Sequence, residues 1–381
     1  MLSLERPACN QYGTSLGYSY SVAQVQAALI APTRVMYYRY KLLDLNMNFK
    51  KWLGQNVTSA SISMDTTQQV MRSADITLTE DPAINYLSDR IQPFAFLQMP
   101  DGNFATFPLG VFLLTTPPRQ TDSSQVVTRE ITGYDLTQIL VDMKTEDRYT
   151  IAVGTNYIAA IRSLLSAAGI TQMNLTATSL TLPTALDWEG GTAYIDIINQ
   201  LLAAINYYNL WFDSSGVAQA QPYISPSVLP PAYTYKDDST SVMTPEVNQN
   251  LDLFSVPNKW ILVVSQSDTA AIVSTYTNDN PNSPTSTVNR GRTIVSYDDT
   301  STAPTQAIND ALVAKQAYQD SQVYETEVFE TLVMPMHEAF DVIQFEYSVL
   351  GVTDKFNEIG WSMNLAAGDT MSHTIQRVVQ V

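Results

Sequence analysis

The chain has 381 residues, which is long enough for two or three domains that each bury a hydrophobic core. It carries 20 basic and 37 acidic residues and shows no cluster of lysines and arginines, which argues against a protein that grips nucleic acid through its phosphates. A single cysteine, Cys9, excludes an intrachain disulfide, and no apolar run reaches the roughly 20 residues that a membrane helix needs. The first residues lack the basic and apolar regions of a signal peptide, so we expect folding in the cytoplasm of the cell that makes the chain.

Residues 1–33 are predicted to form an N-terminal arm. Apolar residues between Ser21 and Ile30 have helical spacing, and Pro32 would end such a helix. A helix this short is not stable by itself, so we expect it to dock on its own domain or on a neighbour. Cys9 lies in this arm without a nearby histidine or base to activate its thiol.

Residues 34–143, called here the first β-region, alternate apolar and polar side chains in short runs. Pro100-Asp101-Gly102 separates two of these runs and is a strong signal for a hairpin turn. Strands this short and this closely spaced predict a β-sandwich or β-barrel. The expected strands cover residues 34–42, 57–64, 75–79, 93–99, 104–107, 111–115 and 126–134.

Residues 144–235, called the α/β module, change to helical spacing and end in a proline-rich linker. The better of two expected helices keeps apolar residues at i, i+3 and i+4. Asp213-Ser214-Ser215-Gly216 is predicted to be the turn of a hairpin. The expected elements are helices at 155–168 and 192–206, strands at 208–212 and 217–223, and the linker at 222–231.

Residues 236–381, called the closing β-region, begin with a buried strand at 259–265 and a polar loop at 277–287. A long helix is predicted over residues 303–322, capped by Thr302, with Pro304 in its first turn. Its apolar residues include Ile308 and Leu312, flanked by Ala311, Ala314 and Tyr318. Strands are expected at 323–331, 341–347, 359–365 and 371–379. The whole chain therefore predicts an α+β, mainly β fold in which two β-domains flank a small α/β module.

Two motifs that are associated with catalysis or metal binding lack the context that such motifs need. Residues 13–17 match G-x-S-x-G, but the nucleophile elbow needs a buried strand before it, and none is expected there. His337-Glu338 begins H-E-x-x-H, but Asp341 stands where the second histidine should be. Because His373 is the only other histidine, a zinc site would need carboxylates for most ligands, and we expect His337 to be structural or on the surface.

Asp187 and Glu189 flank Trp188 and are the remaining candidates for catalysis. Two carboxylates can serve glycoside hydrolysis, but a pair so close in sequence need not face one substrate. The same residues can instead lead into the helix at 192–206, with Trp188 as an apolar staple at its start, and this interpretation needs no catalysis. Gly190-Gly191 lacks the lysine of a phosphate-binding loop. We therefore expect no catalytic, cofactor-binding or metal-binding residue.

Four stretches resemble the baseplate hub and tail-tip proteins of tailed bacteriophages. "MPMHEAFDVIQFEY" and "FNEIGWSMNLAAGDTMSHTIQRV" are similar to the closing segment of that family, and "FPLGVFLLTTPPR" with "REITGYDLTQIL" to the end of its first β-domain. The similarity covers most of residues 34–381. It implies a structural virion protein at the tail tip or baseplate, with two tail-tube-like β-domains of the barrel or sandwich kind.

The resemblance also implies an assembly. It predicts a homotrimer whose six β-domains continue a sixfold tail tube, with a distal tail or tail-tube protein, a tape-measure protein and fibre or receptor-binding proteins as partners. DNA would pass through the lumen without specific binding, which suits a net charge of −17. The strands at 259–265 and 323–331 are apolar enough that, as sheet edges, they would need neighbours to cover them.

Two alternatives of other classes stay open. One is a cell-wall or polysaccharide hydrolase that uses acidic residues such as Asp187 and Glu189. The other is a carbohydrate-binding module, favoured by 21 tyrosines and 5 tryptophans, although most of these aromatic residues fall at positions typical of a core.

Overall fold

The computed structural model describes residues 11–13, 19–121, 125–264, 271–300 and 305–380. The chain divides into two compact units, Met1–Glu246 with Phe329–Thr374, and Val247–Val328 with Ile375–Val381. The expected boundaries at residues 33, 143 and 235 stay a prediction. The expectation of a mainly β chain with a few helices is confirmed. No helix among the described residues is both long enough and apolar enough to span a membrane.

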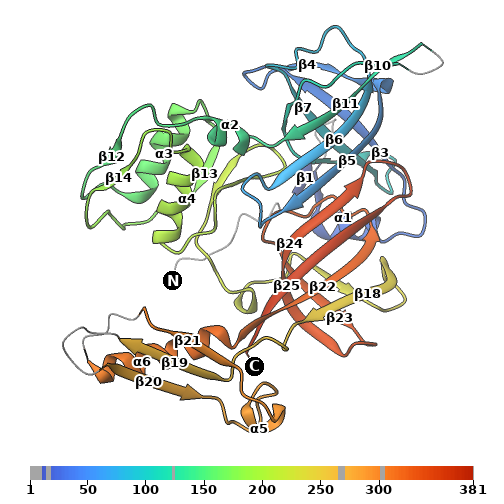
Figure 1. Ribbon diagram of the computed structural model, residues 1–381. Helices are drawn as coiled ribbons and strands as arrows, with labels where there is room; N and C mark the ends of the chain where they lie inside the picture. The colour runs from blue at the N-terminus through green and yellow to red at the C-terminus, as the bar shows by residue number, and fades with distance from the viewer. Residues whose placement is uncertain (1–10, 14–18, 122–124, 265–270, 301–304, 381) are drawn as a thin grey trace. The chain divides into compact units, whose positions relative to one another are not determined.

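The first β-region is a continuous antiparallel sheet in the order β5-β6-β11-β9-β7-β3-β4 (Figure 1). Inward-facing residues alternate along its strands, as at Ile62 and Met64 or Ala74 and Ile76, and are almost fully buried. The expected hairpin is present, with Gly102 at φ +83° in the turn between β7 and β8. The strands are β3 (Met36–Leu43), β4 (Phe49–Trp52), β5 (Val57–Asp65), β6 (Arg72–Thr79), β7 (Arg90–Gln98), β8 (Phe104–Pro108), β9 (Phe112–Leu114), β10 (Gln120–Thr121) and β11 (Val127–Tyr134).

The arm carries the expected short helix, α1 (Val22–Leu29), after the strands β1 (Gln11–Gly13) and β2 (Ser19–Ser21). Ser21 and Gln24 form a reciprocal capping box that satisfies backbone groups at the start of α1. The helix buries Val25 and Leu29, so it docks within its own chain. Residues 1–10, with Cys9, and residues 14–18 lie outside the described part.

The α/β module packs the helices α3 (Tyr157–Ala167) and α4 (Tyr194–Ala204) side by side, as Figure 1 shows. Both were expected, and their apolar stripes meet in one core that also takes in Val111 and Leu136 from the first β-region. The hairpin turn at 213–216 is also confirmed, with Gly216 at φ +83°. The other elements are α2 (Thr137–Asp142), β12 (Tyr149–Ile151), β13 (Met173–Leu175), β14 (Leu186–Trp188), β15 (Trp211–Phe212), β16 (Ala218–Ala220) and the short helix η2 (Pro226–Val228).

Most of the closing β-region joins the same sheet. Its strands β18 (Met243–Leu251), β22 (Gln322–Leu332), β25 (Thr370–Gln380) and β24 (Val352–Asn364) lie in that order. A strand that was not expected, β17 (Tyr233–Lys236), runs parallel to β23 (Val342–Tyr347), which pairs with β24. The boundary between the two units falls within β18, β22 and β25.

The two β-regions meet strand to strand. Residues Gly360–Asn364 of β24 pair antiparallel with Ser61–Asp65 of β5. Gly360 allows this close approach, because a Cβ there would lie 3.3 Å from the Met64 carbonyl oxygen. We call this pairing the β5–β24 seam. It makes one sheet of two segments that lie almost the whole chain apart.

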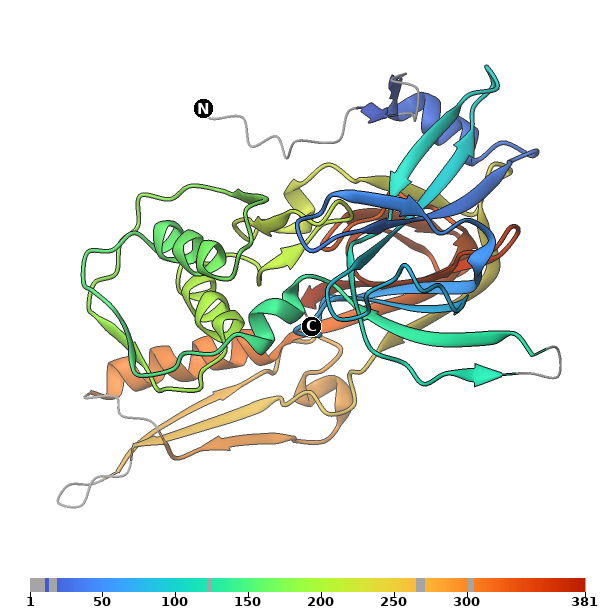
Figure 2. The same cartoon turned by 90° about the horizontal axis from the view of Figure 1, so that it is seen from above.

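In the second unit, α6 (Gln306–Asp320) packs against a sheet in the order β20-β19-β21 (Figure 2). The helix was expected, but the prediction of which face is buried was wrong. Val313 and Ala317 contact Trp260 and Leu262, whereas Ile308, Leu312 and Tyr318 are exposed. Its N-cap is Thr305, whose side chain accepts a hydrogen bond from the amide of Ile308. The expected cap, Thr302, and Pro304 lie outside the described residues. The remaining elements are β19 (Lys259–Val264), β20 (Ile272–Thr277), β21 (Val295–Asp298) and α5 (Thr287–Arg290).

The expectation that residues 259–265 and 323–331 form uncovered sheet edges was wrong. β19 lies between β20 and β21, and β22 lies between β18 and β25. Both strands are therefore paired on either side within the chain, so they give no argument for an oligomer.

Candidate functional site

The loop that connects β22 to β23, residues 333–341, sends its side chains into three different surroundings. His337 points into the core of the closing β-region, Glu338 contacts the first β-region and the α/β module, and Phe340 packs on aromatic rings of that module. We call residues 333–341 the junction loop.

Glu338 bridges two parts of the first unit. Its Oε2 lies 2.7 Å from the Nη2 of Arg72 on β6, and its Oε1 accepts a hydrogen bond of 2.9 Å from the backbone amide of Ser214. The Ser214 carbonyl in turn accepts from the amide of Gly110, at 2.9 Å. One carboxylate thus connects the first β-region and the hairpin turn of the α/β module to the junction loop.

Arg72 is buried and is held on several sides. Its guanidinium lies 5.4 Å from the ring of Trp361 on β24, and its backbone amide donates to Asp135, at 3.1 Å. Burial raises the pKa of Asp135, while hydrogen bonds from Thr137 and Arg72 act in the opposite direction. Gly110 must be glycine, because at φ +131° a Cβ would come within 2.7 Å of the Phe112 ring.

Phe340 occupies a backbone conformation that is rare for a bulky residue, with φ +62°. Its ring stacks on Tyr208, with centroids 4.2 Å apart, and meets Trp211 edge-on at 5.3 Å. Such contacts offset the strain of the left-handed conformation.

Both histidines of the chain meet in a buried polar cluster. Glu358 on β24 lies between them, with Oε1 2.5 Å from the Nδ1 of His373 on β25 and Oε2 3.0 Å from the Nδ1 of His337. The Nε2 atoms contact hydroxyl groups, His337 with Tyr235 at 2.7 Å and His373 with Thr331 at 2.9 Å. All five side chains are closed off from solvent, so the expectation of a structural His337 fits and that of a surface residue does not. We call these five residues the histidine cluster.

Charge within this cluster is strongly coupled. Burial alone would raise the pKa of Glu358, but its attraction to the two imidazoles outweighs burial and lowers the pKa to about 2. Burial would lower the pKa of His337, but Glu358 and Asp341 raise it to about 10. For His373 burial prevails and lowers the pKa. The charge of Glu358 is thus coupled to the protonation of the two imidazoles.

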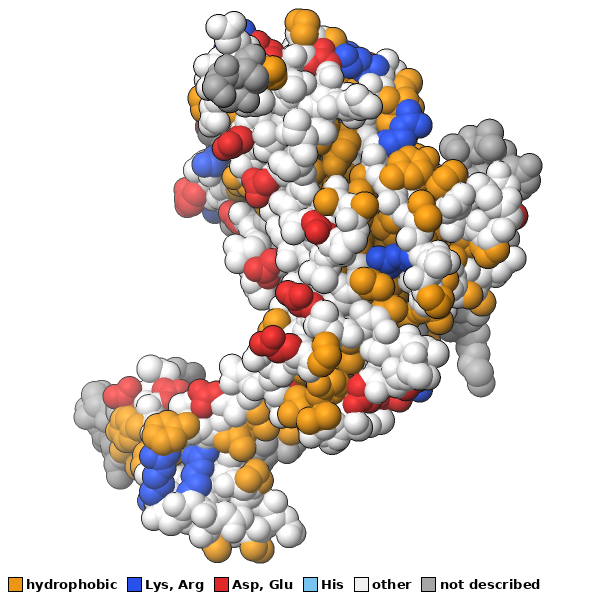
Figure 3. Space-filling model, turned by 90° about the vertical axis from the view of Figure 1, so that its right-hand side faces the viewer, with side chains coloured by type: hydrophobic (Ala, Val, Ile, Leu, Met, Phe, Trp, Pro, Cys, Tyr) orange, Lys and Arg blue, Asp and Glu red, His pale blue; other side chains and the backbone are white. Residues whose placement is uncertain are grey.

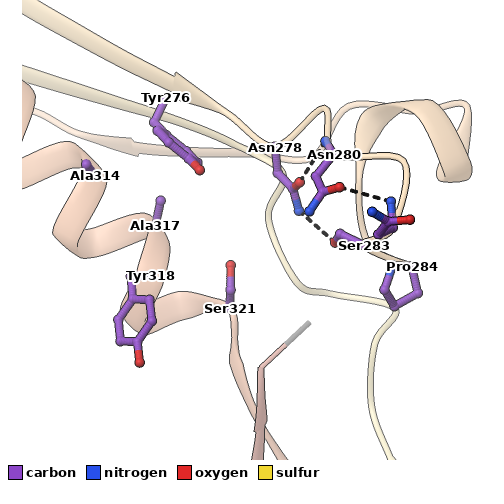
Figure 4. Close-up of a pocket in the computed structure, with 10 residues that line it drawn as sticks. Tyr276, Asn278, Asn280, Ser283, Pro284, Ala314, Ala317, Tyr318 and Ser321 are labelled. Atoms are coloured by element: carbon purple, nitrogen blue, oxygen red, sulfur yellow. Dashed lines mark hydrogen bonds between the residues drawn. The ribbon is translucent and has the colours of Figure 1, made fainter.

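Arg72, Glu338 and the two histidines do not line either of two recesses in the described part of the chain. A recess of about 320 Å³ lies in the second unit, where Tyr276, Asn278 and Tyr318 point toward it (Figure 4). Its lining has no histidine and no carboxylate, and Asn278 already donates to Ser283, at 2.9 Å. A smaller recess is lined mainly by residues 233–242. Its lining includes Tyr235, Lys236 and Asp238.

Asp187 and Glu189 are both exposed. Asp187 accepts hydrogen bonds from Thr150 and Arg148, which hold its pKa below the usual range, and Glu189 contributes its backbone carbonyl to Thr145. Trp188 is buried and donates to Gln200 of α4, at 2.7 Å, which agrees with its expected role beside the helix. The serine of the G-x-S-x-G match lies outside the described residues.

Sequence reasoning missed the grouping of His337, Glu358 and His373. The alternation along the strands gave a signal. Glu358 and His373 stand at inward positions, because residues two places away from them, such as Phe356 and Ile375, are apolar and buried. A charged residue on the inward face of a strand indicates a buried partner.

The chain can be compared with known protein families, sequences and solved structures. No family model and no curated protein sequence matches the chain. Among solved structures, the tail protein from Neisseria meningitidis MC58 matches with a TM-score of 0.59 at 13% identity, over 90% of this chain and 97% of that one. The 43 kDa tail protein of prophage MuSo2 from Shewanella oneidensis matches with a TM-score of 0.60 at 10% identity, over 90% and 98%. The fold is that of phage tail proteins.

A third similar structure belongs to the PdpA-VgrG complex of Francisella. A chain of the Francisella PdpA-VgrG complex in its half-lidded form matches with a TM-score of 0.57 at 8% identity, over 91% of this chain and 58% of that one. The resemblance seen in the sequence is thus confirmed at the level of the fold.

Proposed function

We propose that the chain is a structural virion protein, the hub of a phage tail tip or baseplate, which closes the tail tube. The observation that carries this proposal is the match of nearly the whole chain to nearly the whole of two phage tail proteins. The β5–β24 seam adds to it, because it joins a strand of each β-region in one sheet. A hub at the end of a tube must resist deformation while other components bind it.

The finer proposal is a homotrimer in which each chain contributes two tube-like β-domains. Its partners would be a distal tail or tail-tube protein, a tape-measure protein, and fibre or receptor-binding proteins. The protein would be assembled in the host cytoplasm and remain in the tail tip of the virion. Closed point-group symmetry is the usual arrangement of such assemblies.

The decisive experiment counts copies. Native mass spectrometry of the chain, co-expressed with its tube-side neighbour, or a reconstruction of tail tips without imposed symmetry should show three copies of the 42.2 kDa chain around one axis. A single copy, or six copies that each place one β-domain in the ring, would refute the trimeric hub. Loss of the chain should also leave tails that lack a closed tip.

We also propose that the chain is not an enzyme. Support comes from the exposed position of Asp187 and Glu189 and from the pairing of Asp187 with Arg148 and Thr150. A carbohydrate-binding platform is disfavoured too, since Trp188, Trp211, Trp260 and Trp361 are buried. Peptidoglycan or capsule hydrolysis that is lost in both Asp187→Ala and Glu189→Ala would contradict this view.

A further inference from the structure

The histidine cluster brings together three atoms of the kinds that bind transition metals. One ligand atom each from His337, Glu358 and His373 lies within 4.8 Å of the others, and all three residues are buried. They come from the junction loop, β24 and β25, so an ion among them would tie three segments of the chain together.

The hydroxyl groups around the cluster decide which imidazole nitrogen carries a proton. The hydroxyl of Thr331 donates to the carbonyl of Leu332, at 2.8 Å, so its oxygen accepts from the Nε2 of His373, at 2.9 Å. With its proton on Nε2, a neutral His373 turns the lone pair of Nδ1 toward the anionic Oε1 of Glu358, at 2.5 Å. Two lone pairs at that distance repel, so either a proton or a metal ion must lie between them.

The Nδ1 of His337 lies on the other side of the carboxylate. This Nδ1 and the Oε2 of Glu358 are 3.0 Å apart, yet the two atoms are not aligned for a hydrogen bond, and neither has another hydrogen-bond partner among the residues that the structure describes. Both side chains are completely buried. Unpartnered buried polar atoms carry a cost of desolvation that a shared ligand would remove.

The outer contacts match those of metal-bound histidines. In such sites the nitrogen that does not bind the metal is hydrogen-bonded, which sets the tautomer and the ring orientation. Here the Nε2 atoms contact the hydroxyls of Tyr235 and Thr331, and both Nδ1 atoms face the carboxylate. The rings are also fixed by packing, since His373 stacks on Phe329 with centroids 4.9 Å apart.

We propose that His337, Glu358 and His373 form a buried structural site for a zinc ion. Two imidazole nitrogens with a carboxylate suit Zn²⁺ better than Ca²⁺ or Mg²⁺, which prefer oxygen ligands. Asp341 is placed to supply a fourth ligand or further negative charge, because its Oδ2 lies 3.6 Å from the Nδ1 of His337. Binding requires Glu358 and His373 to separate, since two ligands of a tetrahedral zinc lie roughly 3.3 Å apart.

Zinc at this point would pin the junction loop. His337 is the residue before Glu338, whose carboxylate connects the loop to Arg72 and Ser214. An ion that binds the native state but not the unfolded chain raises stability by mass action. The site would therefore strengthen the part of the protein in which the β-regions and the α/β module meet.

The test uses the full chain after treatment with a chelator. Titration with zinc should show one ion bound per chain and a higher Tm, and Co²⁺ should give the intense visible absorption of a four-coordinate site. The chain contains only two histidines, so a bound metal with two imidazole ligands can occupy no other place. X-ray absorption, and NMR of labelled histidine during the titration, should show both rings bound through Nδ1.

Variants give an independent check. Glu358→Gln keeps the size of the side chain and should weaken zinc binding by more than about 100-fold, the upper end of what loss of an outer partner costs. Glu327→Gln, which alters a buried carboxyl group without a histidine beside it, should bind zinc like the wild type. If Glu358→Gln does not fold, the spectroscopy of the wild type still decides.

Several results would overturn the proposal. Zinc bound only through oxygen ligands would assign the ion to surface carboxylates. Unchanged histidine signals during titration would mean that the cluster holds protons only. Equal zinc affinity in Glu358→Gln and the wild type would exclude Glu358 as a ligand.

Discussion

The carboxylate of Glu338 satisfies a buried guanidinium and a backbone amide at the same time. Arg72 is only 2% exposed, and its partner is about a quarter exposed, so water screens the pair weakly on one side. Removal of one member of such a pair leaves a charge in the interior without its counter-ion. The stability of the first unit should therefore depend on this contact more than on surface ion pairs.

Glu338→Gln keeps an oxygen for Ser214 but removes the negative charge that faces Arg72. We expect it to lower the free energy of unfolding by about 2–3 kcal/mol, less than for a fully enclosed pair because Glu338 is partly exposed. Urea unfolding of the variant and the wild type measures the difference. The matched control, Glu130→Gln on the exposed face of β11, should change stability by less than about 0.5 kcal/mol. An equal effect of both variants would show that the contact contributes nothing.

Glu327 predicts a pH dependence of the second unit. Glu325 and Glu327 both accept from the amide nitrogen of Gln249, at 2.8 and 2.9 Å, and Arg377 forms an ion pair with Glu325. Burial, with added repulsion from Glu325, raises the pKa of Glu327 from 4.5 to about 7. Because the folded pKa is the higher one, this group stabilises the fold below pH 4.5, and that stability is lost as pH rises through 7.

Wild-type protein should therefore lose up to about 3 kcal/mol of stability through this group between pH 4.5 and 7. Glu327→Gln cannot ionise and should show a flatter profile over the same range. Thermal unfolding at half-unit pH steps compares the two proteins. Parallel profiles would mean that Glu327 has an ordinary pKa in the folded state.

Local sequence patterns predicted which helices and strands form better than they predicted which face of a helix is buried. The helices at 155–168 and 192–206 and the strands around residues 57–64 and 371–379 were correct to within a few residues, because their periodicity coincides with burial. The helix at 303–322 was also real, but its buried face was not the most apolar one. The polar Asn309 is fully buried there, since its amide donates to the Leu262 carbonyl and to Ser274, both at 2.9 Å. Periodicity alone does not reveal such a partner.

The orientation of α6 can be tested with two neighbouring residues. Val313 is 3% exposed and Leu312 is 39% exposed. Val313→Ala should lower the stability of the second unit by about 1–2 kcal/mol, although it removes fewer atoms than Leu312→Ala, which should change stability by less than about 0.5 kcal/mol. Denaturant unfolding of the two variants gives the order. The reverse order would restore the face that the sequence indicated.

For the whole molecule, the stretches that resembled phage proteins turn out to surround the junction loop. They contain Gly110 and Asp135 near Arg72, together with Glu338, Trp361 and His373. The similarity could be seen in the sequence, but the grouping could not, because it depends on pairings across the chain. Thr66, for example, donates to the Ile359 carbonyl, 293 residues away. No local pattern specifies such a contact.

The net charge of −17 carries a prediction for the assembled tip. Figure 3 shows one face of the molecule on which uncharged side chains predominate and lysines and arginines stand in small, scattered groups. A lumen built from such surfaces should let DNA slide past without retention. Purified assemblies should therefore show no DNA binding at 50 mM salt, about the low end of the range over which phosphate contacts are strong. Binding that weakens steeply with added salt would indicate a basic lumen.

The β5–β24 seam also has a consequence for synthesis. The edge of β5 that pairs with β24 lacks this partner until the ribosome has made about 300 further residues. Thr66 and Ile359, which are in contact, are 293 residues apart in the sequence. At the usual 5–20 residues per second, that interval lasts roughly 15–60 s. Throughout it the nascent chain presents an open strand edge, which favours association with chaperones or with other nascent chains. A chain released early keeps that edge exposed, so only translation through residue 364 yields a protein whose first sheet is finished.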